Sequence, residues 1–285
     1  MTERLSDVTA RIGSVRQLSS VIGAMRGIAA ARAREARERV EGVRAYARTV
    51  GAAIGQALAL VEGPAGPSSD GAGGSLVIAL CAEQGFAGPF NRRVLEVVER
   101  LINSAPPGAT ELLLLGGRGL AAAQERGLRL GWSAPMAAHV DEAAALADRV
   151  TEQLYARLDE GRATRVTLAY ATPEPTAEIQ VVERTLAPFD FARFPRTRNL
   201  SPPLITLPPA VLLAELAEEY VFAELTEALT LSLAAENEAR MRAMTAAKSN
   251  VAKMLDELVS RARQLRQEEI TNEIIELGGR RAARR

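Results

Sequence analysis

The chain has 285 residues, and its 35 Lys and Arg side chains balance its 35 Asp and Glu side chains, so the formal net charge is zero. A neutral molecule has no general electrostatic field that attracts nucleic acid or an anionic membrane surface. The length exceeds the commonest size of a single domain, which favours one large domain or a domain with long extensions. Aromatic residues make up only 4% of the chain, which favours helices packed through small side chains over an aromatic-rich sandwich.

The cysteine content and the apolar stretches limit where the protein can reside. Cys81 is the only cysteine, so no intrachain disulfide can form and a reducing compartment is favoured. The first residues, MTERLSD, lack the apolar core of a signal peptide. The longest apolar stretches, such as residues 76–82, are too short to span a bilayer. We therefore expect a soluble intracellular protein that does not insert into the membrane.

The first part of the chain carries one unbroken helical pattern. Steps of three and four residues, interrupted only by Ser19 and Arg26, connect Leu5, Val8, Ile12, Val15, Ser19, Ile22, Arg26, Ala29, Ala33, Ala36, Val40, Val43, Ala47, Val50, Ile54, Ala57 and Val61. A 3.5-residue repeat sustained this long predicts a helix that supercoils around a partner helix. The predicted shaft helix covers residues 1–62, and at a rise of 1.5 Å per residue its patterned part, from Leu5 to Val61, would run about 85 Å.

The middle of the chain alternates between strand and helix patterns. Residues 63–74, rich in Pro, Gly and Ser, end the first helix. Short apolar or β-branched runs then predict strands at residues 75–81, 111–115, 165–171 and 178–186, and helical patterns cover residues 92–103, 117–126 and 141–160. This alternation predicts a compact Rossmann-like α/β domain with a largely parallel sheet over residues 75–195.

A second long helix is predicted over residues 208–278, starting at Pro208 and Pro209 and stopping at Gly278 and Gly279. Its clearest heptad positions are Met241, Met244, Lys248, Val251, Leu255, Leu258, Ala262 and Leu265. Neither long helix can bury its apolar seam alone, so we expect the two to pair. The predicted fold class is therefore α/β plus coiled coil, in which the terminal helices form a long antiparallel coiled coil beside the central domain.

Three stretches resemble the gamma subunits of F-type ATP synthases. Residues 12–30, IGSVRQLSSVIGAMRGIAA, are similar to a signature in which an I-x-S-V run leads to K-A-M-x-M-V-A-A. Residues 238–250, EARMRAMTAAKSN, resemble E-x-x-A-R-M-x-A-M-x-x-A-x-x-N, and residues 266–276, RQEEITNEIIE, resemble the ending A-R-Q-x-x-I-T-x-E-L-x-E. Together with the architecture of the middle, the resemblance covers essentially the whole chain, which is identified as a member of this family.

The chain departs from the family pattern at several positions. Residues 82–91, AEQGFAGPFN, stand where the family commonly has S-D-R-G-L-C-G-G-F-N, so the Arg and the Cys are lost. Gly23 replaces the Lys of K-A-M-x-M, and Gly27 replaces its second Met. These departures indicate a divergent bacterial branch, such as the alternate sodium-linked type.

The resemblance implies a non-catalytic rotor subunit without a cofactor. Its expected partners are the α and β subunits of the α3β3 ring, the epsilon subunit and the membrane c-ring, on the cytoplasmic side of the bacterial inner membrane. The family motifs imply that the residues facing acidic and polar loops of β are Met25, Arg26, Arg266, Gln267 and Thr271. Arginine suits such contacts because its planar fork pairs with a carboxylate through two hydrogen bonds.

The α/β domain is, in the same resemblance, the foot that rests on the membrane ring and holds epsilon. Candidates for its contacts are Glu83, Gln84 and Phe86, which follow the first predicted strand. Packing of a loop at the end of a strand accounts for these residues equally well.

A nucleotide-binding enzyme is the main alternative. Residues 115–122, LGGRGLAA, follow a predicted strand, open a predicted helix and fit G-x-G-x-x-A. A dinucleotide site also requires an acidic residue at the end of the next strand, whereas the strand predicted over residues 128–132 ends at Trp132. A tight strand-to-helix turn explains the glycines without a ligand, and we prefer that interpretation.

Other functional interpretations of the sequence have less support. His139 is the only histidine, which leaves nothing for a His-based metal site or a catalytic triad. Cys81 lies in an apolar strand pattern, where a buried, inert thiol is expected. A coiled-coil tether that does not rotate shares the helical periodicity but gives no reason for the motif at residues 266–271.

Overall fold

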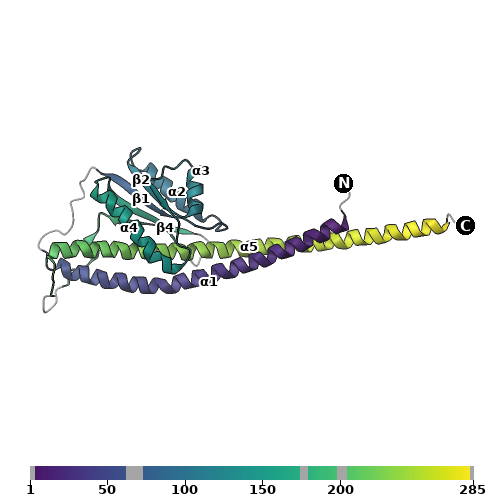
Figure 1. Ribbon diagram of the computed structural model, residues 1–285, viewed down its shortest axis with the longest axis horizontal. Helices are drawn as coiled ribbons and strands as arrows, with labels where there is room; N and C mark the ends of the chain where they lie inside the picture. Colours follow the sequence, from purple (N-terminus) through teal and green to yellow (C-terminus); the bar gives the residue numbers. More distant parts are fainter. Residues whose placement is uncertain (1–3, 62–72, 174–178, 198–203, 283–285) are drawn as a thin grey trace. The chain divides into compact units, whose positions relative to one another are not determined.

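The computed structural model describes residues 4–61, 73–173, 179–197 and 204–282. The chain divides into two compact units, one of residues 1–28 with residues 241–285, and one of residues 29–240. Two helices, α1 (Leu5–Leu58) and α5 (Pro209–Ala282), contribute to both units. Figure 1 shows the two helices and the strands of the larger unit.

The larger unit contains a five-stranded sheet with the strand order β3-β2-β1-β4-β5. The strands are β1 (Gly74–Leu80), β2 (Thr110–Leu115), β3 (Trp132–Ala134), β4 (Ala163–Thr172) and β5 (Gln180–Ala187). The first four are mutually parallel, and β5 runs antiparallel to β4. The helices between them are α2 (Phe90–Asn103), α3 (Gly117–Glu125) and α4 (Ala143–Asp159), and 3-10 turns cover Val140–Glu142 and Phe191–Arg193. The expected Rossmann-like, largely parallel sheet is confirmed.

One predicted strand was wrong. Of residues 128–132 only Trp132 belongs to a strand, because the pairing with β2 is confined to Trp132–Ala134. Gly131 still donates its N–H to the carbonyl oxygen of Leu112 at 2.9 Å. The apolar residues 128 and 130 pack beside the sheet instead of joining it.

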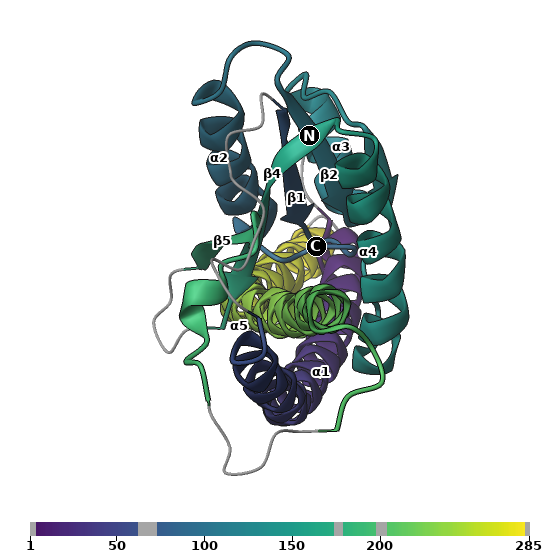
Figure 2. The same ribbon diagram turned by 90° about the vertical axis from the view of Figure 1, so that its left-hand side faces the viewer.

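Helices cover both faces of the sheet. In β1, Leu76, Ile78 and Leu80 belong to one buried cluster, and Val77 and Ala79 belong to another. The first cluster includes residues of α4 and α5, and the second includes residues of α2 and α3. Figure 2 shows α2 and α4 on opposite sides of the strands. Burial on both faces explains why β1 reads as a continuous apolar run and not as an alternating pattern.

Within the larger unit, α5 is the central helix. Residues 231–240 are all buried, because the sheet and its helices pack on one side and α1 packs on the other. On α1 the predicted seam is buried at Ala29, Ala33, Ala36, Val40, Val50, Ile54 and Ala57. Ile54 clusters with Leu213, and Ala36 clusters with Leu233, so lower positions of α1 meet higher positions of α5. This order confirms the antiparallel pairing.

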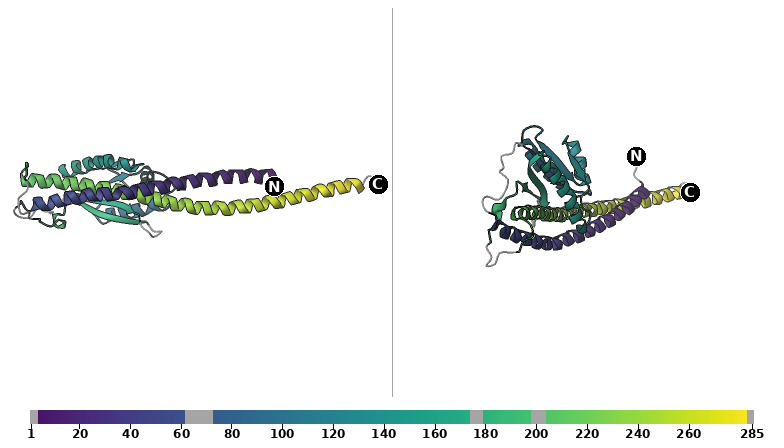
Figure 3. Two further views of the ribbon diagram at one scale, coloured as in Figure 1. Left: turned by 90° about the horizontal axis from the view of Figure 1, so that it is seen from below. Right: turned by 60° about the vertical axis from the view of Figure 1, so that its left-hand side comes forward.

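In the smaller unit the same two helices pair again. Ile22, Met244 and Val251 form a buried cluster against which Met25 packs, and Val8 is fully buried on α1. Lys248 is exposed although it occupies a predicted seam position; its long side chain can keep the ammonium group in water while neighbouring apolar residues fill the interface. Beyond Leu265, residues 266–275 of α5 are all exposed, and Figures 1 and 3 show this end of α5 running past the start of α1.

Both long helices end at residues other than the predicted ones, and α1 ends at Leu58 instead of residue 62. The expected stop at Gly278 and Gly279 is wrong, since α5 continues through both glycines to Ala282. A glycine inside a helix costs about 1 kcal/mol relative to alanine, which weakens a helix without obliging it to end. No helix in the described part of the chain is long and apolar enough to cross a membrane.

The small residues of the α1 seam give a first prediction. Ala36 has no exposed surface and contacts Val140, Leu233 and Ala234, so Ala36→Leu should overpack this contact and destabilise the protein by about 1–3 kcal/mol. Urea unfolding followed by circular dichroism measures the change. Ala45→Leu, at an exposed position of the same helix, is the control and should leave the midpoint nearly unchanged; equal midpoints for both variants would contradict the tight seam.

Candidate partner-contact sites

The loop between β1 and α2 is attached to the rest of the larger unit through Glu83. Oε2 of Glu83 accepts hydrogen bonds from the backbone N–H groups of Gly117, at the start of α3, and Met136, each at 2.9 Å. A carboxylate at the start of a helix is favoured because the N–H groups there lack partners within the helix. Glu83 therefore makes intrachain contacts, as the loop-packing interpretation expected.

The same loop is bound from the other side by α5. The carboxylate of Glu236 accepts from the backbone N–H groups of Glu83 and Gln84, each at 3.4 Å. The guanidinium of Arg240 donates to the carbonyl oxygens of Gln84 and Gly85, each at 3.1 Å, and forms an ion pair with Glu236. Both charged side chains are almost completely buried. Burial raises the pKa of Glu236, and the charge and hydrogen bond of Arg240 oppose that rise.

Phe86 lies at the outer side of this loop. Its exposed fraction is 67%, and its φ of 64° places a non-glycine residue in the left-handed region. Such a conformation costs on the order of 1–3 kcal/mol and persists only where neighbouring contacts enforce it. Gln84 is also exposed. Of the three residues predicted in this loop, Gln84 and Phe86 therefore face outward, whereas Glu83 points into the fold.

The glycines that suggested a nucleotide site are explained by packing. Gly116 has a φ of 108°, and a Cβ there would lie 2.4 Å from the carbonyl oxygen of Cys81. A Cβ at Gly119 would lie 2.0 Å from the Cβ of Cys81. The turn from β2 into α3 is thus pressed against the end of β1, and only glycine fits.

The space that a dinucleotide would need is already occupied. The Glu83 carboxylate binds the N–H of Gly117, so the start of α3 presents a negative charge to any phosphate. In open α/β sheets ligands bind at the carboxyl ends of the strands, where the strand order reverses, which in this sheet is between β1 and β4. There Ala235 and Ala239 of α5 pack in the same cluster as Ala169 and Ala171 of β4. This geometry does not support the nucleotide-binding alternative.

The expected burial of Cys81 is confirmed. Cys81 is 1% exposed, and burial, followed by the charge of Glu236, raises the pKa of its thiol to about 12, so the thiol stays protonated near neutral pH. His139 is exposed and leads the turn Val140–Glu142. No group of three or more His, Cys, Asp or Glu side chains that could hold a metal ion occurs among the residues described.

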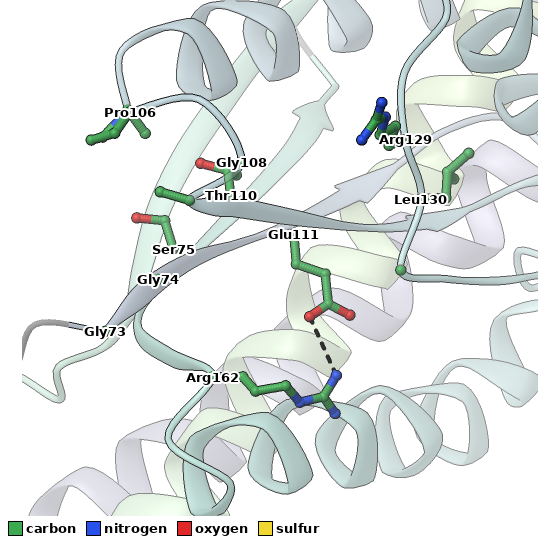
Figure 4. Close-up of a pocket in the computed structure, with 13 residues that line it drawn as sticks. Gly73, Gly74, Ser75, Pro106, Gly108, Thr110, Glu111, Arg129, Leu130 and Arg162 are labelled. Atoms are coloured by element: carbon green, nitrogen blue, oxygen red, sulfur yellow. Dashed lines mark ion pairs between the residues drawn. The ribbon is translucent and has the colours of Figure 1, made fainter.

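A cavity of about 860 Å³ lies at the opposite edge of the sheet, near the amino ends of β1 and β2. Figure 4 shows Glu111 facing Arg162 in this cavity, and the two side chains form an ion pair of 3.6 Å. Arg157, which is buried, also pairs with Glu111 at 2.7 Å. Glu111 is thus neutralised by the protein itself, and the cavity is at the wrong edge of the sheet for a typical nucleotide site.

The residues predicted on the paired helices lie in two separate places within the smaller unit. Met25 packs partly against the cluster of Ile22 and Met244, and Arg26 is exposed beside it. Arg266, Gln267 and Thr271 are exposed on the last turns of α5, where Thr271 Oγ1 donates to the carbonyl oxygen of Gln267 at 2.8 Å. Arg266 follows Met244 by 22 positions, which is about 33 Å along a helix. The structure therefore does not bring the two sets together.

An exposed apolar stripe on α1 was missed by the sequence prediction. Leu18, Val21 and Ile28 are each about half exposed, and they continue through Met25 at spacings of three and four. This stripe is a second helical repeat beside the buried seam, so the signal was present in the sequence. Ile270, Ile274 and Ile275 are also exposed on the last turns of α5. Exposed apolar residues gathered in this way are typical of surfaces that bind other proteins.

The glycine packing leads to a second prediction. Gly119→Ala should destabilise the protein by about 1–3 kcal/mol or more, because the added methyl group meets Cys81. Gly42→Ala, at a helical position with open space, should instead be neutral or stabilising by up to about 1 kcal/mol. Thermal unfolding of both variants distinguishes them. A Gly119→Ala variant as stable as the parent would show that the turn is not close-packed.

Solved structures with the same fold come from ATP synthases. A chain in the rotor of the Euglena gracilis mitochondrial ATP synthase, in rotational state 1, has a TM-score of 0.63 at 13% identity and covers 93% of this chain and 98% of its own. A chain in the central stalk and c-ring of the Tetrahymena thermophila mitochondrial ATP synthase has a TM-score of 0.57 at 22% identity, covering 80% and 99% respectively. These similarities establish the fold.

Sequence comparison gives the family. The ATP synthase gamma chain of Solibacter usitatus is 29% identical over 283 residues, and that of Pelodictyon phaeoclathratiforme is 28% identical over 285 residues; each comparison covers 96% of both chains. The family model described as ATP synthase matches residues 4–283. The family expected from residues 12–30 and 266–276 is thereby confirmed: the chain belongs to the ATP synthase gamma-chain family.

Proposed function

We propose that this gamma subunit couples ion-driven rotation of a membrane c-ring to ATP synthesis or hydrolysis on the β subunits of an α3β3 ring. It is a non-catalytic subunit and forms the central stalk. The observation that carries the proposal is the antiparallel pairing of α1 and α5, which buries the seam at Ile22, Met244 and Val251 and leaves a second apolar stripe on the surface. A two-helix shaft of this kind suits the narrow axis of a ring.

The shaft of the smaller unit presents different chemistry on its different sides. The stripe through Leu18, Val21 and Ile28 is apolar, Arg26 adds a cation beside it, and residues 266–275 of α5 are all exposed. Three β subunits around such a shaft meet different surfaces at any one time. Because only differential contacts can bias a conformational equilibrium, rotation of the shaft would move each catalytic site through successive conformations.

Arg26 and Arg266 are the proposed polar contacts with β. Both guanidinium groups are exposed and form no ion pair with any side chain that the structure describes. An exposed arginine costs little to bring against a partner carboxylate and offers two parallel hydrogen bonds. Gln267 and Thr271 lie on the same turns of α5 as Arg266, so they belong to the same proposed contact, and Met25 belongs to the contact at Arg26.

The larger unit is proposed as the foot, on the cytoplasmic side of the bacterial inner membrane, where it contacts epsilon and the c-ring. Gln84 and Phe86 are its candidate contacts, because both are exposed on a loop held in place by other parts of the unit. Glu83 would support that loop through its bonds to Gly117 and Met136. The assignment to the alternate sodium-linked subtype stays a prediction from the motif departures.

Arg266 offers a direct test of the shaft contacts. Arg266→Ala should leave the isolated chain folded, because the side chain is exposed. It should lower the yield of α3β3γ complex or its rotation-coupled ATPase activity about tenfold or more, since a charged hydrogen-bonded contact is worth about 1.5–3 kcal/mol. Arg48→Ala, at an exposed position of α1 outside the motifs, is the control. Equal yield and coupling in both variants would contradict the role of Arg266.

Phe86 tests the foot contact separately. Phe86→Ala should leave stability unchanged or slightly lower and should reduce the affinity of the chain for its epsilon and c-ring partners by about tenfold or more, as expected for an aromatic anchor residue. Pull-down of purified partner subunits, with Gln180→Ala at an exposed position of β5 as the control, measures this. Retained affinity for both partners would remove Phe86 from the contact.

A further inference from the structure

Among the buried groups that the proposed function does not use, the charged pair of α5 is the best defined. Glu236 is 3% exposed and Arg240 is 5% exposed, within a stretch of α5 that is buried on all sides. Buried ion pairs are seldom the most stable way to fill a core, because apolar residues of similar volume are often neutral or better. A contribution to the stability of the fold is therefore a weak explanation for the presence of this pair in the core.

The hydrogen bonds of the pair are directed almost entirely at one loop. The Arg240 guanidinium donates to the carbonyl oxygens of Gln84 and Gly85, as well as to Glu236 and to Oδ1 of Asn237. The Glu236 carboxylate accepts from the N–H groups of Glu83 and Gln84. Four backbone groups of residues 83–85 are thus satisfied by two side chains that lie more than 150 positions later in the chain.

This loop has no regular backbone pairing of its own. Residues 83–86 lie outside every helix and strand, and within the described ranges no backbone–backbone hydrogen bond involves them. The side chains of the pair therefore supply the hydrogen bonds that a neighbouring strand or turn would otherwise supply to this loop. The arginine fork reaches these groups from two separate nitrogens, Nε for the carbonyl oxygen of Gly85 and Nη2 for Gln84 and Glu236, whereas lysine would have to reach all of them from a single nitrogen.

We propose that the buried Glu236–Arg240 pair is a positioning device through which α5 sets the conformation of residues 83–86 and hence the orientation of Phe86. The proposal rests on the proposed function only in treating Phe86 as a contact for a partner. Enforcement by the pair accounts for the left-handed backbone of Phe86, whose φ is 64°, because such strain needs neighbouring contacts that hold it. Any displacement of α5 is then passed directly to the exposed aromatic ring, without an intervening flexible linker.

The first experiment measures the loop in the isolated full-length chain. In Glu236→Gln, amide hydrogen exchange at Glu83 and Gln84 should accelerate about ten- to hundredfold, because a neutral amide is a weaker acceptor for these two N–H groups than the carboxylate. In Arg240→Met the same amides should accelerate to a similar degree, because the loop loses the hydrogen bonds at the carbonyl oxygens of Gln84 and Gly85 that hold it against α5. Arg240→Lys keeps the charge and should accelerate the same amides, because one ammonium group cannot replace the fork. Unchanged exchange in all three variants would overturn the proposal.

Two further variants separate positioning from general stability. Arg157→Met removes another buried arginine, which pairs with Glu111 and does not touch the loop; it should lower the unfolding midpoint and leave exchange at residues 83 and 84 unchanged. The double variant Glu236→Leu with Arg240→Met fills the site with apolar side chains and should stay folded, with fast exchange at the loop. Slow amide exchange at residues 83 and 84 in the double variant would refute the positioning role of the pair. Exchange at these amides that is as fast in Arg157→Met as in Arg240→Met would also refute it, because the effect would then be one of general stability.

The outcome for the proposed function is read separately. In pull-downs with epsilon and c-ring subunits, the double variant should lose affinity to a similar degree as Phe86→Ala, because both remove a correctly oriented ring. Fast loop exchange without loss of affinity in either variant would retain the positioning device and reject Phe86 as a contact. Loss of affinity in Phe86→Ala alone, with slow exchange in the double variant, would retain the contact and reject the device.

Discussion

The burial of α5 is the constraint on which the larger unit depends. Its residues 231–240 have no exposed side, since α1 packs against one side and the α/β sheet packs against the other. Small residues make this possible: Ala234 and Ala235 of α5 and Ala36 of α1 leave room for close approach of the helices and the sheet. A charged group on a helix that is buried on all sides is costly unless it is paired. That requirement explains why Glu224, Glu236, Glu238 and Arg240 all have charged partners.

The same constraint explains how a Rossmann-like sheet can exist without a nucleotide site. The edge at which such sheets bind ligands is closed by the protein itself, because α5 packs at the reversal of strand order and Glu83 binds the start of α3. The glycines of residues 115–122 permit close contact with Cys81. The sheet thus serves as a rigid support that presents the loop of residues 83–86, and the similarity to nucleotide-binding folds is one of architecture only.

Two sides of α1 have different roles: one side packs against α5, and the other is exposed. On α1, the repeat through Val8, Ile12 and Ile22 is buried, and Ile22 packs against α5, whereas the neighbouring repeat through Leu18, Val21 and Ile28 is exposed. One repeat therefore stabilises the pair and the other remains for a partner. Residues 266–275 of α5, which include Arg266 and Thr271, are all exposed, so the stability of this segment depends on helix propensity and on the surroundings that a complex supplies.

The amino-acid sequence by itself determined the helical seams, the parallel strands and the family motifs, because periodicity and turn residues are local properties of a chain. It could not determine that Glu83 points into the fold while Phe86 faces solvent. It also could not determine that β3 begins only at Trp132 or that α5 continues past Gly278. Nor did it indicate that Glu236 and Arg240 bind a loop more than 150 positions earlier. Those features depend on which distant groups meet in space, and hydrogen bonding between such groups is decided only when the tertiary structure forms.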